Sequence, residues 1–348
     1  MASDIERRKA DHLDLCATDA VAFRERTTLL EQVRLVHQSL PELSLAEVDP
    51  SVELFGKTLR FPIVIAGMTG GHARAAEINR GLAAVAEARG YGFGLGSQRA
   101  MHEQPELAST YAVRDVAPTT LLLGNIGVVT ARDLPTSAIA TLVESVGADA
   151  LCVHMNPAME IVQPEGDRDF RGGLATFERL VRDLGKPVVA KETGNGISSL
   201  TAARLASVGV RAIDTSGAGG TSWVGVETLR AEGNERRLGE AFWDWGVPTA
   251  VSIVASVKAG HTVIATGGIT SGLDVARSVA LGARAAGFAR HAYTAYVEGG
   301  ESAAHAFFEG VESELRAAML LTGSASLDDL RQAPRILTGE LRDWLRDL

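Results

Sequence analysis

The stretch "TVIATGGITSGLDVARSVALGARAAGFAR", residues 262–290, holds two short apolar runs with a helical segment between them. The first run ends in Gly267 and Gly268, and the second ends in Ala289 and Arg290. An apolar strand that ends in small or polar residues and is followed by a helix is typical of a βα unit in a parallel sheet. The stretch therefore predicts two consecutive βα units.

The same pattern recurs through the middle of the chain. Six further apolar runs occupy residues 61–68, 91–97, 119–127, 148–156, 187–195 and 210–219. Eight such units predict an α/β fold of the closed (β/α)₈ TIM-barrel type. An open doubly wound sheet is the alternative, but it would need a GxGxxG fingerprint after the first strand, and "AGMTGGHA" (66–73) does not supply one.

The barrel does not account for the whole chain. We expect residues 61–301 to form the barrel, residues 1–60 to form an N-terminal extension that packs on it, and residues 302–348 to add C-terminal helices to the same domain. Residues 220–246 make a long excursion before the seventh strand, and long loops in compact domains are often functional.

Composition narrows the classes of partner. The 348 residues are 46% hydrophobic and carry a net charge of -9, which argues against a general affinity for nucleic acid or anionic membranes. The two cysteines, Cys16 and Cys152, form no disulfide framework, which suits a reducing compartment. The charged N-terminus is not a secretory signal, and no run reaches the ~20 apolar residues of a membrane span. We expect a cytoplasmic protein.

The ends of the predicted strands are rich in polar residues and glycines. Active sites of such barrels lie at these carboxyl ends, and the loops after strands seven and eight commonly bind a phosphate through backbone N–H groups. Ser97, Asn125, Lys191 and Thr221 are placed to surround a planar ring held by that phosphate. Because a lysine cation stabilises an electron-rich flavin, this spacing indicates FMN as the cofactor.

Several segments resemble one family along residues 7–345. They are "RRKADH" (7–12), "MTGG" (68–71), "GSQRA" (96–100), "HMNPAMEIVQPEGDRDF" (154–170), "KETGNGIS" (191–198), "DTSGAGGTSW" (214–223) and "LTGELRDWL" (337–345). Together they resemble the type II, FMN-dependent isopentenyl diphosphate isomerases. "QPEGDRDF" and "SGAGGTSW" are the specific parts, because the glycine-rich stretch at 267–283 is shared with other FMN barrels.

The resemblance implies an enzyme that uses reduced FMN and Mg²⁺ to convert isopentenyl diphosphate to dimethylallyl diphosphate, with NADPH as a candidate reductant and a tetramer or octamer as its assembly. The implied FMN contacts are Ala66, Met68, Thr69, Ser97, Asn125, Lys191, Ser216, Thr221, Gly267, Gly268, Ala289 and Arg290. The implied diphosphate and substrate contacts are Arg8, Lys9, Ser97, Gln98 and Arg99, joined by His154 and Asn156, with Glu160 as the single Mg²⁺ carboxylate. A cluster of cations is what a diphosphate requires.

One position departs from the family motif, His-x-Asn-x-x-Gln-Glu. In "HMNPAME" (154–160) the glutamine beside the reacting alkene is replaced by Met159, so the implied catalytic set is His154, Asn156 and Met159. An amide donates and accepts hydrogen bonds, whereas a thioether is at best a weak acceptor. If reduced FMN handles the proton, the change predicts a slower isomerase. If the glutamine is required, the change predicts a pocket adapted to a bulkier or more apolar ligand.

Three functions therefore stay open at the level of sequence. They are an isopentenyl diphosphate isomerase, a diverged FMN enzyme that acts on another allylic diphosphate or prenylated substrate, and a catalytically silent protein that binds flavin or prenyl diphosphate. The 2-hydroxy-acid oxidases share the barrel but need a histidine base after strand six. "DTSGAGG" (214–220) offers no imidazole there, so we discard that function.

Overall fold

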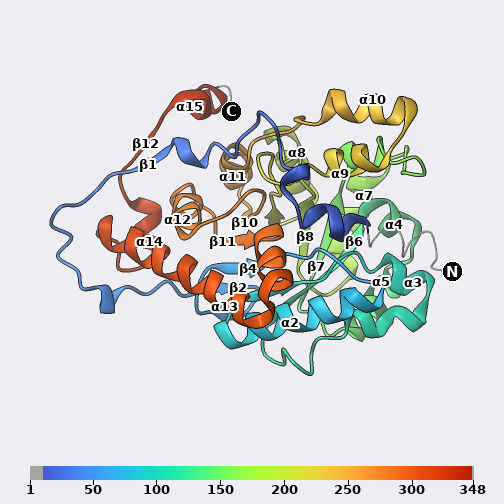
Figure 1. The fold of residues 1–348 in the computed structure, drawn as a ribbon, viewed down its shortest axis with the longest axis horizontal. Helices are drawn as coiled ribbons and strands as arrows, with labels where there is room; N and C mark the ends of the chain where they lie inside the picture. Colours follow the sequence, from blue (N-terminus) through green and yellow to red (C-terminus); the bar gives the residue numbers. More distant parts are fainter. Residues whose placement is uncertain (1–10, 347–348) are drawn as a thin grey trace.

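The computed structural model describes residues 11–346 and contains a closed parallel barrel (Figure 1). Its strand order is β10-β11-β4-β5-β6-β7-β8-β9, which confirms the predicted (β/α)₈ fold. The strands are β4 (Ile63–Ile65), β5 (Gly92–Gly94), β6 (Leu121–Gly127), β7 (Ala150–Met155), β8 (Val188–Glu192), β9 (Ala212–Asp214), β10 (Thr262–Ala265) and β11 (Ala285–Phe288).

Helices surround the barrel, as Figure 1 shows. They are α2 (Ala73–Arg89), α3 (Arg99–Glu103), α4 (Val128–Asp133), α5 (Thr136–Ser145), α6 (Pro157–Glu160), α7 (Gly173–Asp183), α8 (Ser199–Ser207), α9 (Trp223–Arg230), α10 (Gly233–Phe242), α11 (Thr249–Lys258), α12 (Gly272–Ala280), α13 (Arg290–Leu321), α14 (Leu327–Gln332) and α15 (Gly339–Arg346). Within residues 11–346, no helix combines the length and the apolar character that a bilayer crossing requires.

Local sequence explains where these elements begin and end. The hydroxyl of Ser271 accepts a hydrogen bond from the backbone N–H of Asp274, which caps α12. Helix α2 ends at Arg89 and is capped by Gly90, whose φ of 71° is left-handed and favours glycine. All residues of β4 and β6 are buried, as expected for parallel strands that are covered on both faces.

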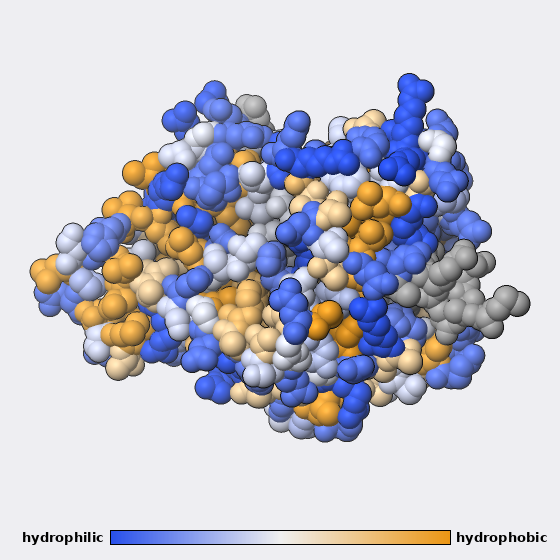
Figure 2. All heavy atoms as spheres, in the orientation of Figure 1, coloured by the Kyte–Doolittle hydropathy of each residue, from blue (hydrophilic) through white to orange (hydrophobic). Residues whose placement is uncertain are grey.

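Segments before and after the barrel pair with each other. Strand β1 (Val33–Leu35) runs antiparallel to β12 (Arg335–Leu337), so that the early and late parts of the chain lie side by side. Strands β2 (Val52–Leu54) and β3 (Lys57–Leu59) form a hairpin. Figure 2 shows that hydrophilic residues cover much of the visible face, with hydrophobic groups more frequent toward the side that carries α13 and α14.

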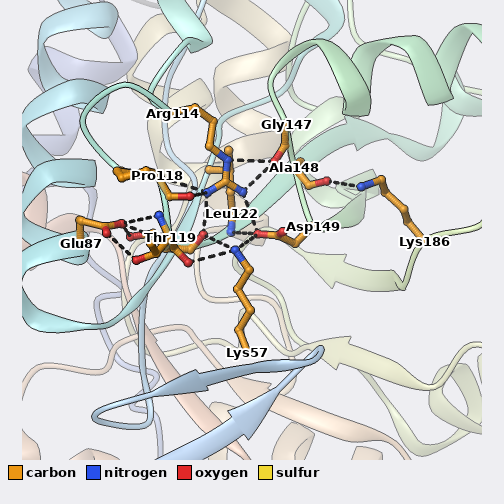
Figure 3. Close-up of polar contacts among 12 residues, drawn as sticks. Lys57, Glu87, Arg114, Pro118, Thr119, Leu122, Gly147, Ala148, Asp149 and Lys186 are labelled. Carbon is orange, nitrogen blue, oxygen red and sulfur yellow. Dashed lines mark hydrogen bonds and ion pairs between the residues drawn. The ribbon is translucent and has the colours of Figure 1, made fainter.

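Charged side chains join the amino ends of the neighbouring strands β6, β7 and β8 (Figure 3). Oδ2 of Asp149 lies 2.8 Å from Nη2 of Arg114 and 3.1 Å from Nζ of Lys57, and it accepts a hydrogen bond of 2.8 Å from the N–H of Leu122. Lys186 donates to the carbonyl of Ala148 at 2.8 Å. Because active sites of these barrels lie at the opposite end, we interpret this cluster as structural.

Candidate active site

A cavity of about 270 Å³ opens at the carboxyl ends of the strands. Loops after all eight strands contribute to its wall, so the fold gathers residues that are far apart in sequence. Of the residues that the sequence singled out, the wall includes Ala66, Met68, Thr69, Ser97, Arg99, Asn125, His154, Asn156, Met159, Glu160, Lys191, Ser216, Thr221, Gly267, Gly268, Ala289 and Arg290. The expected contacts Arg8 and Lys9 lie outside the described residues.

Gln98 is the one described candidate that does not line this cavity. Its side chain is buried, Nε2 donates to the carbonyl of Leu142 at 2.9 Å, and Oε1 accepts from the N–H of Asn125 at 3.0 Å. The amide therefore joins the end of β6 to α5. The neighbouring Arg99 stays at the rim, where it forms an ion pair of 2.7 Å with Glu103.

Strands β6 and β7 place two polar side chains in contact. Nδ1 of His154 lies 2.9 Å from Oδ1 of Asn125, whose own Nδ2 donates to the carbonyl of Leu95 at 3.0 Å. Burial, together with the positive charge of Lys191, lowers the pKa of His154 from 6.5 to about 4. The imidazole is therefore neutral at physiological pH.

Glu160 follows β7 on the single turn α6, which begins after Asn156 and has Pro157 at its first position. Oε1 of Glu160 accepts from Nδ2 of Asn156 at 2.7 Å, and Oε2 accepts from the N–H of Asp167 at 2.8 Å. Among the described residues, no group of three His, Cys, Asp or Glu side chains surrounds a metal site. A divalent ion at Glu160 would thus depend on ligand oxygens and water, which is an arrangement that Mg²⁺ accepts.

Met159 lies beside this carboxylate in the cavity wall. Its sulfur is 3.8 Å from Nδ2 of Asn156, which is a weak contact because a thioether accepts hydrogen bonds poorly. The amide of Asn156 is already committed to Glu160 at 2.7 Å. The side chain at position 159 therefore adds apolar surface to an otherwise polar part of the wall.

On β8 and β9, a buried cation faces the cavity. Nζ of Lys191 lies 2.9 Å from Oδ2 of Asp214 and donates to Oγ of Ser216 at 3.5 Å. Ser216 has a φ of 35°, in the left-handed region that non-glycine residues seldom adopt. Such backbone strain gathers at functional sites and persists only when the surroundings hold it. Here the N–H of Ser216 donates to Oγ1 of Thr266 at 2.8 Å.

The loops after β9, β10 and β11 form a glycine-lined part of the wall. Gly267 has a φ of 97°, and a Cβ added there would lie 2.2 Å from the carbonyl oxygen of Gly217. A Cβ on Gly220 would lie 2.3 Å from the nitrogen of Gly268. Only glycine permits this close approach of backbones. Helix α13 begins beside it at Arg290, and the first N–H groups of a helix are free to bind an anion.

Arg290 also connects this wall to the segment before the barrel. Its Nη1 lies 2.6 Å from Oδ1 of Asp19 and donates to the carbonyl of Thr18 at 3.0 Å. The N–H of Phe23 donates to the carbonyl of Gly220 at 3.1 Å. The segment around residues 18–23 therefore lies next to the glycine-lined loops.

The wall also includes residues that were not among the candidates from sequence, and His12, Thr193 and Trp223 are three of them. His12 and Trp223 meet edge to face at 5.2 Å, and Nε2 of His12 lies 2.7 Å from Oε1 of the buried Glu227. Thr193 follows β8, and within residues 11–346 its buried Oγ1 has no hydrogen-bond partner. The sequence did offer a signal for these residues. His12 lies in "RRKADH", Thr193 lies in "KETGNGIS", and Trp223 lies in the excursion at 220–246.

Comparison with known proteins agrees with this geometry. A family model described as FMN-dependent dehydrogenase matches residues 1–232 and 173–336. The chain is 45% identical over 349 residues to an isopentenyl-diphosphate delta-isomerase from Methanothermobacter thermautotrophicus, covering 98% of this chain and 96% of the relative. It is 42% identical over 352 residues to the enzyme of the same name from Halobacterium salinarum, covering 99% and 97%.

Solved structures resemble the fold. Mandelate oxidase with (S)-2-phenylpropionate superposes with a TM-score of 0.64 at 20% identity, over 96% of this chain and 97% of that chain. At this level of identity the likeness concerns the barrel alone. The full-length relatives at 42–45% identity carry the information about family.

Proposed function

Because the chain belongs to the type II isopentenyl diphosphate isomerases, within the FMN-dependent dehydrogenase family, we propose that it converts isopentenyl diphosphate to dimethylallyl diphosphate. The proposal includes reduced FMN and Mg²⁺ as cofactors and NADPH as reductant. The observation that carries it is that one cavity combines two half-sites. The polar wall after β7 lies four strands away from β11 in either direction around the barrel, and therefore opposite the part of the glycine-lined wall where α13 begins.

The glycine-lined half suits FMN. Backbone N–H groups near Gly267, Gly268 and the start of α13 would hold the phosphate. Lys191 would face the ring together with Oγ1 of Thr193, which has no hydrogen-bond partner among the described residues. When bound and reduced, FMN would supply an electron-rich ring that exchanges protons.

The polar half suits a magnesium diphosphate. Glu160 is oriented by Asn156 and by the N–H of Asp167, so it would hold Mg²⁺ together with diphosphate oxygens and water. Arg99, at the rim, supplies a guanidinium for the same anion. We propose that Arg8 and Lys9 add to this charge.

The reaction is a balanced proton shift. The terminal alkene carbon of isopentenyl diphosphate gains a proton, and the carbon between the alkene and the ester-bearing carbon loses one, so no electrons are consumed. His154 is neutral and Met159 has no transferable proton, so neither side chain is a ready acid. We assign them positioning of the hydrocarbon part of the substrate, with Asn156 as the nearby amide.

Met159 also supports a second candidate function. A thioether adapts to irregular apolar shapes, so the wall at Met159 suits a longer prenyl chain. An FMN-dependent reaction on another allylic diphosphate or prenylated substrate would use the same two half-sites.

The test is turnover by the FMN-loaded protein without oxygen. Isopentenyl diphosphate, Mg²⁺ and NADPH or dithionite are added, and dimethylallyl diphosphate is followed by proton NMR. Formation of that product supports the isomerase. Normal binding of FMN and diphosphate without product would reject it, and conversion of a longer allylic diphosphate under the same conditions would favour the second function.

We propose that the protein is a cytoplasmic homo-oligomer, a tetramer or octamer by analogy with the family. Light scattering coupled to size-exclusion chromatography measures the assembly, and a monomeric mass across micromolar concentrations would reject it. Fractionation of the source cells tests the cytoplasmic location.

A further inference from the structure

A buried carboxylate, that of Asp214, lies behind Lys191 in the cavity wall. Lys191 and Asp214 pair across the neighbouring strands β8 and β9, and Nζ lies 2.9 Å from Oδ2. Their side chains are only 9% and 5% exposed. Lys191 lines the cavity, whereas Asp214 is not part of the wall that the described residues form. A ligand in the cavity therefore meets the lysine, and the carboxylate lies behind it.

The carboxylate is held at both oxygens. Oδ2 contacts Lys191, and Oδ1 accepts a hydrogen bond from the hydroxyl of Thr266. The same hydroxyl accepts from the N–H of Ser216 at 2.8 Å, and Oγ of Ser216 accepts from Lys191 at 3.5 Å. These four residues form a closed ring of contacts. The position of Nζ is therefore fixed by Asp214 and Ser216 together.

The ion pair also reduces the positive potential that Lys191 presents to the cavity. Opposite charges in contact offset each other strongly where the surroundings exclude water. A ligand beside Lys191 consequently experiences less positive potential than an unpaired ammonium would produce. An anionic or electron-rich ring therefore gains less electrostatic binding free energy from the paired lysine than it would from an unpaired one.

We propose that Asp214 is a positioning residue that limits the positive charge Lys191 presents to bound FMN. It thereby sets the ratio of affinities for oxidised and reduced cofactor. The inference rests on the proposed FMN binding and extends it to a residue outside the wall. Its consequence for the reaction is that the reduced ring stays electron-rich.

The first experiment replaces the carboxylate by a neutral group of the same shape, Asp214→Asn. We expect the ratio of the Kd for oxidised FMN to the Kd for reduced FMN to rise about tenfold, which equals a rise of about 30 mV in the two-electron midpoint potential. A dye-coupled anaerobic titration measures the potential. An unchanged or lower potential would overturn the proposal.

Glu192→Gln is the matched control. Glu192 is buried next to Lys191 in sequence, but its Oε2 accepts from the N–H groups of Thr193, Gly194 and Asn195 at 2.7, 2.7 and 2.5 Å. Burial raises the pKa of Glu192 to about 7, so both variants are compared above that pH, where Glu192→Gln removes the same formal charge without breaking a contact with Nζ. We expect a smaller shift than for Asp214→Asn. Equal shifts would indicate a general charge effect and would overturn the assignment.

A second comparison shows whether Asp214 acts through the lysine. In a Lys191→Met background, the additional change Asp214→Asn should leave the potential nearly unchanged, because no ammonium remains to be offset. A shift as large as in the wild-type background would overturn the proposal. This comparison does not need the single variant Asp214→Asn. In Lys191→Met the unpaired buried carboxyl of Asp214 takes up a proton and becomes neutral, and the double variant contains neither charge.

The wild-type protein separates this inference from the proposed function. Failure to bind FMN would overturn both. Turnover of isopentenyl diphosphate, combined with a potential that is insensitive to Asp214→Asn, would overturn only the role of Asp214.

Discussion

Asn125 determines which nitrogen of His154 carries the proton. Because Nδ2 of Asn125 donates to the carbonyl of Leu95, its Oδ1 must accept, and Nδ1 of His154 at 2.9 Å is the donor. Nε2 therefore carries the lone pair. A diphosphate oxygen accepts hydrogen bonds, so the neutral ring offers its Nε2 to a donor and not to that anion.

The low pKa of His154 predicts a loss of stability in acid. The pKa is about 4 in the folded protein and 6.5 when exposed, so the unfolded chain binds the additional proton as the pH falls from 6.5 to 4. Stability should decrease by about 3 kcal/mol over that range from this group. Urea unfolding at several pH values should show a smaller decrease in His154→Gln. The exposed His37→Gln is the control, and equal pH dependence in all three proteins would contradict the prediction.

Removing the lysine of the buried ion pair should destabilise the protein even without cofactor. Lys191→Ala leaves Asp214 as an unpaired buried carboxylate, which typically costs about 3–5 kcal/mol. We expect a lower urea midpoint for the apoprotein and weaker FMN binding. Lys191→Met combined with Asp214→Asn should recover much of the stability but not the FMN affinity. A stable Lys191→Ala protein with normal flavin affinity would argue against this placement of the lysine.

Glu160 should control the response to magnesium. Loss of even a hydrogen-bond partner of a metal ligand costs about 10–100-fold in metal affinity, so Glu160→Gln should cost at least about tenfold. Calorimetric titration of Mg²⁺ in the presence of diphosphate measures this affinity. Glu165→Gln, an exposed carboxylate on the same loop, is the control. FMN binding should not change in either variant, and equal Mg²⁺ affinities would contradict the role of Glu160.

Position 159 should limit the rate of isomerisation. A single lost positioning contact can cost about 100-fold, so Met159→Gln should raise the rate by up to that factor. Ala158→Gln places the same amide on the preceding residue, which is not part of the cavity wall formed by the described residues. Initial rates without oxygen compare the three proteins. No gain in Met159→Gln would favour a pocket adapted to another substrate.

The strand pattern and many strand-end residues of the wall could be predicted from sequence for a physical reason. Strands buried on both faces read as continuous apolar runs, and parallel strands end at one face of the barrel. Residues at the run ends, such as Asn125 and Lys191, are therefore brought together without any knowledge of side-chain geometry.

Contacts that depend on register and side-chain direction could not be predicted. Asp214 lies within one of the predicted strands, and the sequence does not show that β8 and β9 align it with Lys191. Gln98 lies between Ser97 and Arg99, yet its amide turns inward to Leu142. His12 and Trp223, 211 positions apart, meet only through the fold. Such pairs require tertiary structure, because sequence spacing carries no information about them.

The most direct test of the proposed isomerase is turnover in deuterium oxide. The FMN-loaded protein, reduced without oxygen, is mixed with isopentenyl diphosphate and Mg²⁺, and the product is examined by proton and deuterium NMR. We predict dimethylallyl diphosphate with deuterium in a methyl group, because migration of the double bond adds a deuteron from the solvent to the terminal carbon. A reduced, FMN-loaded protein that leaves the substrate unconverted and unlabelled would contradict the account.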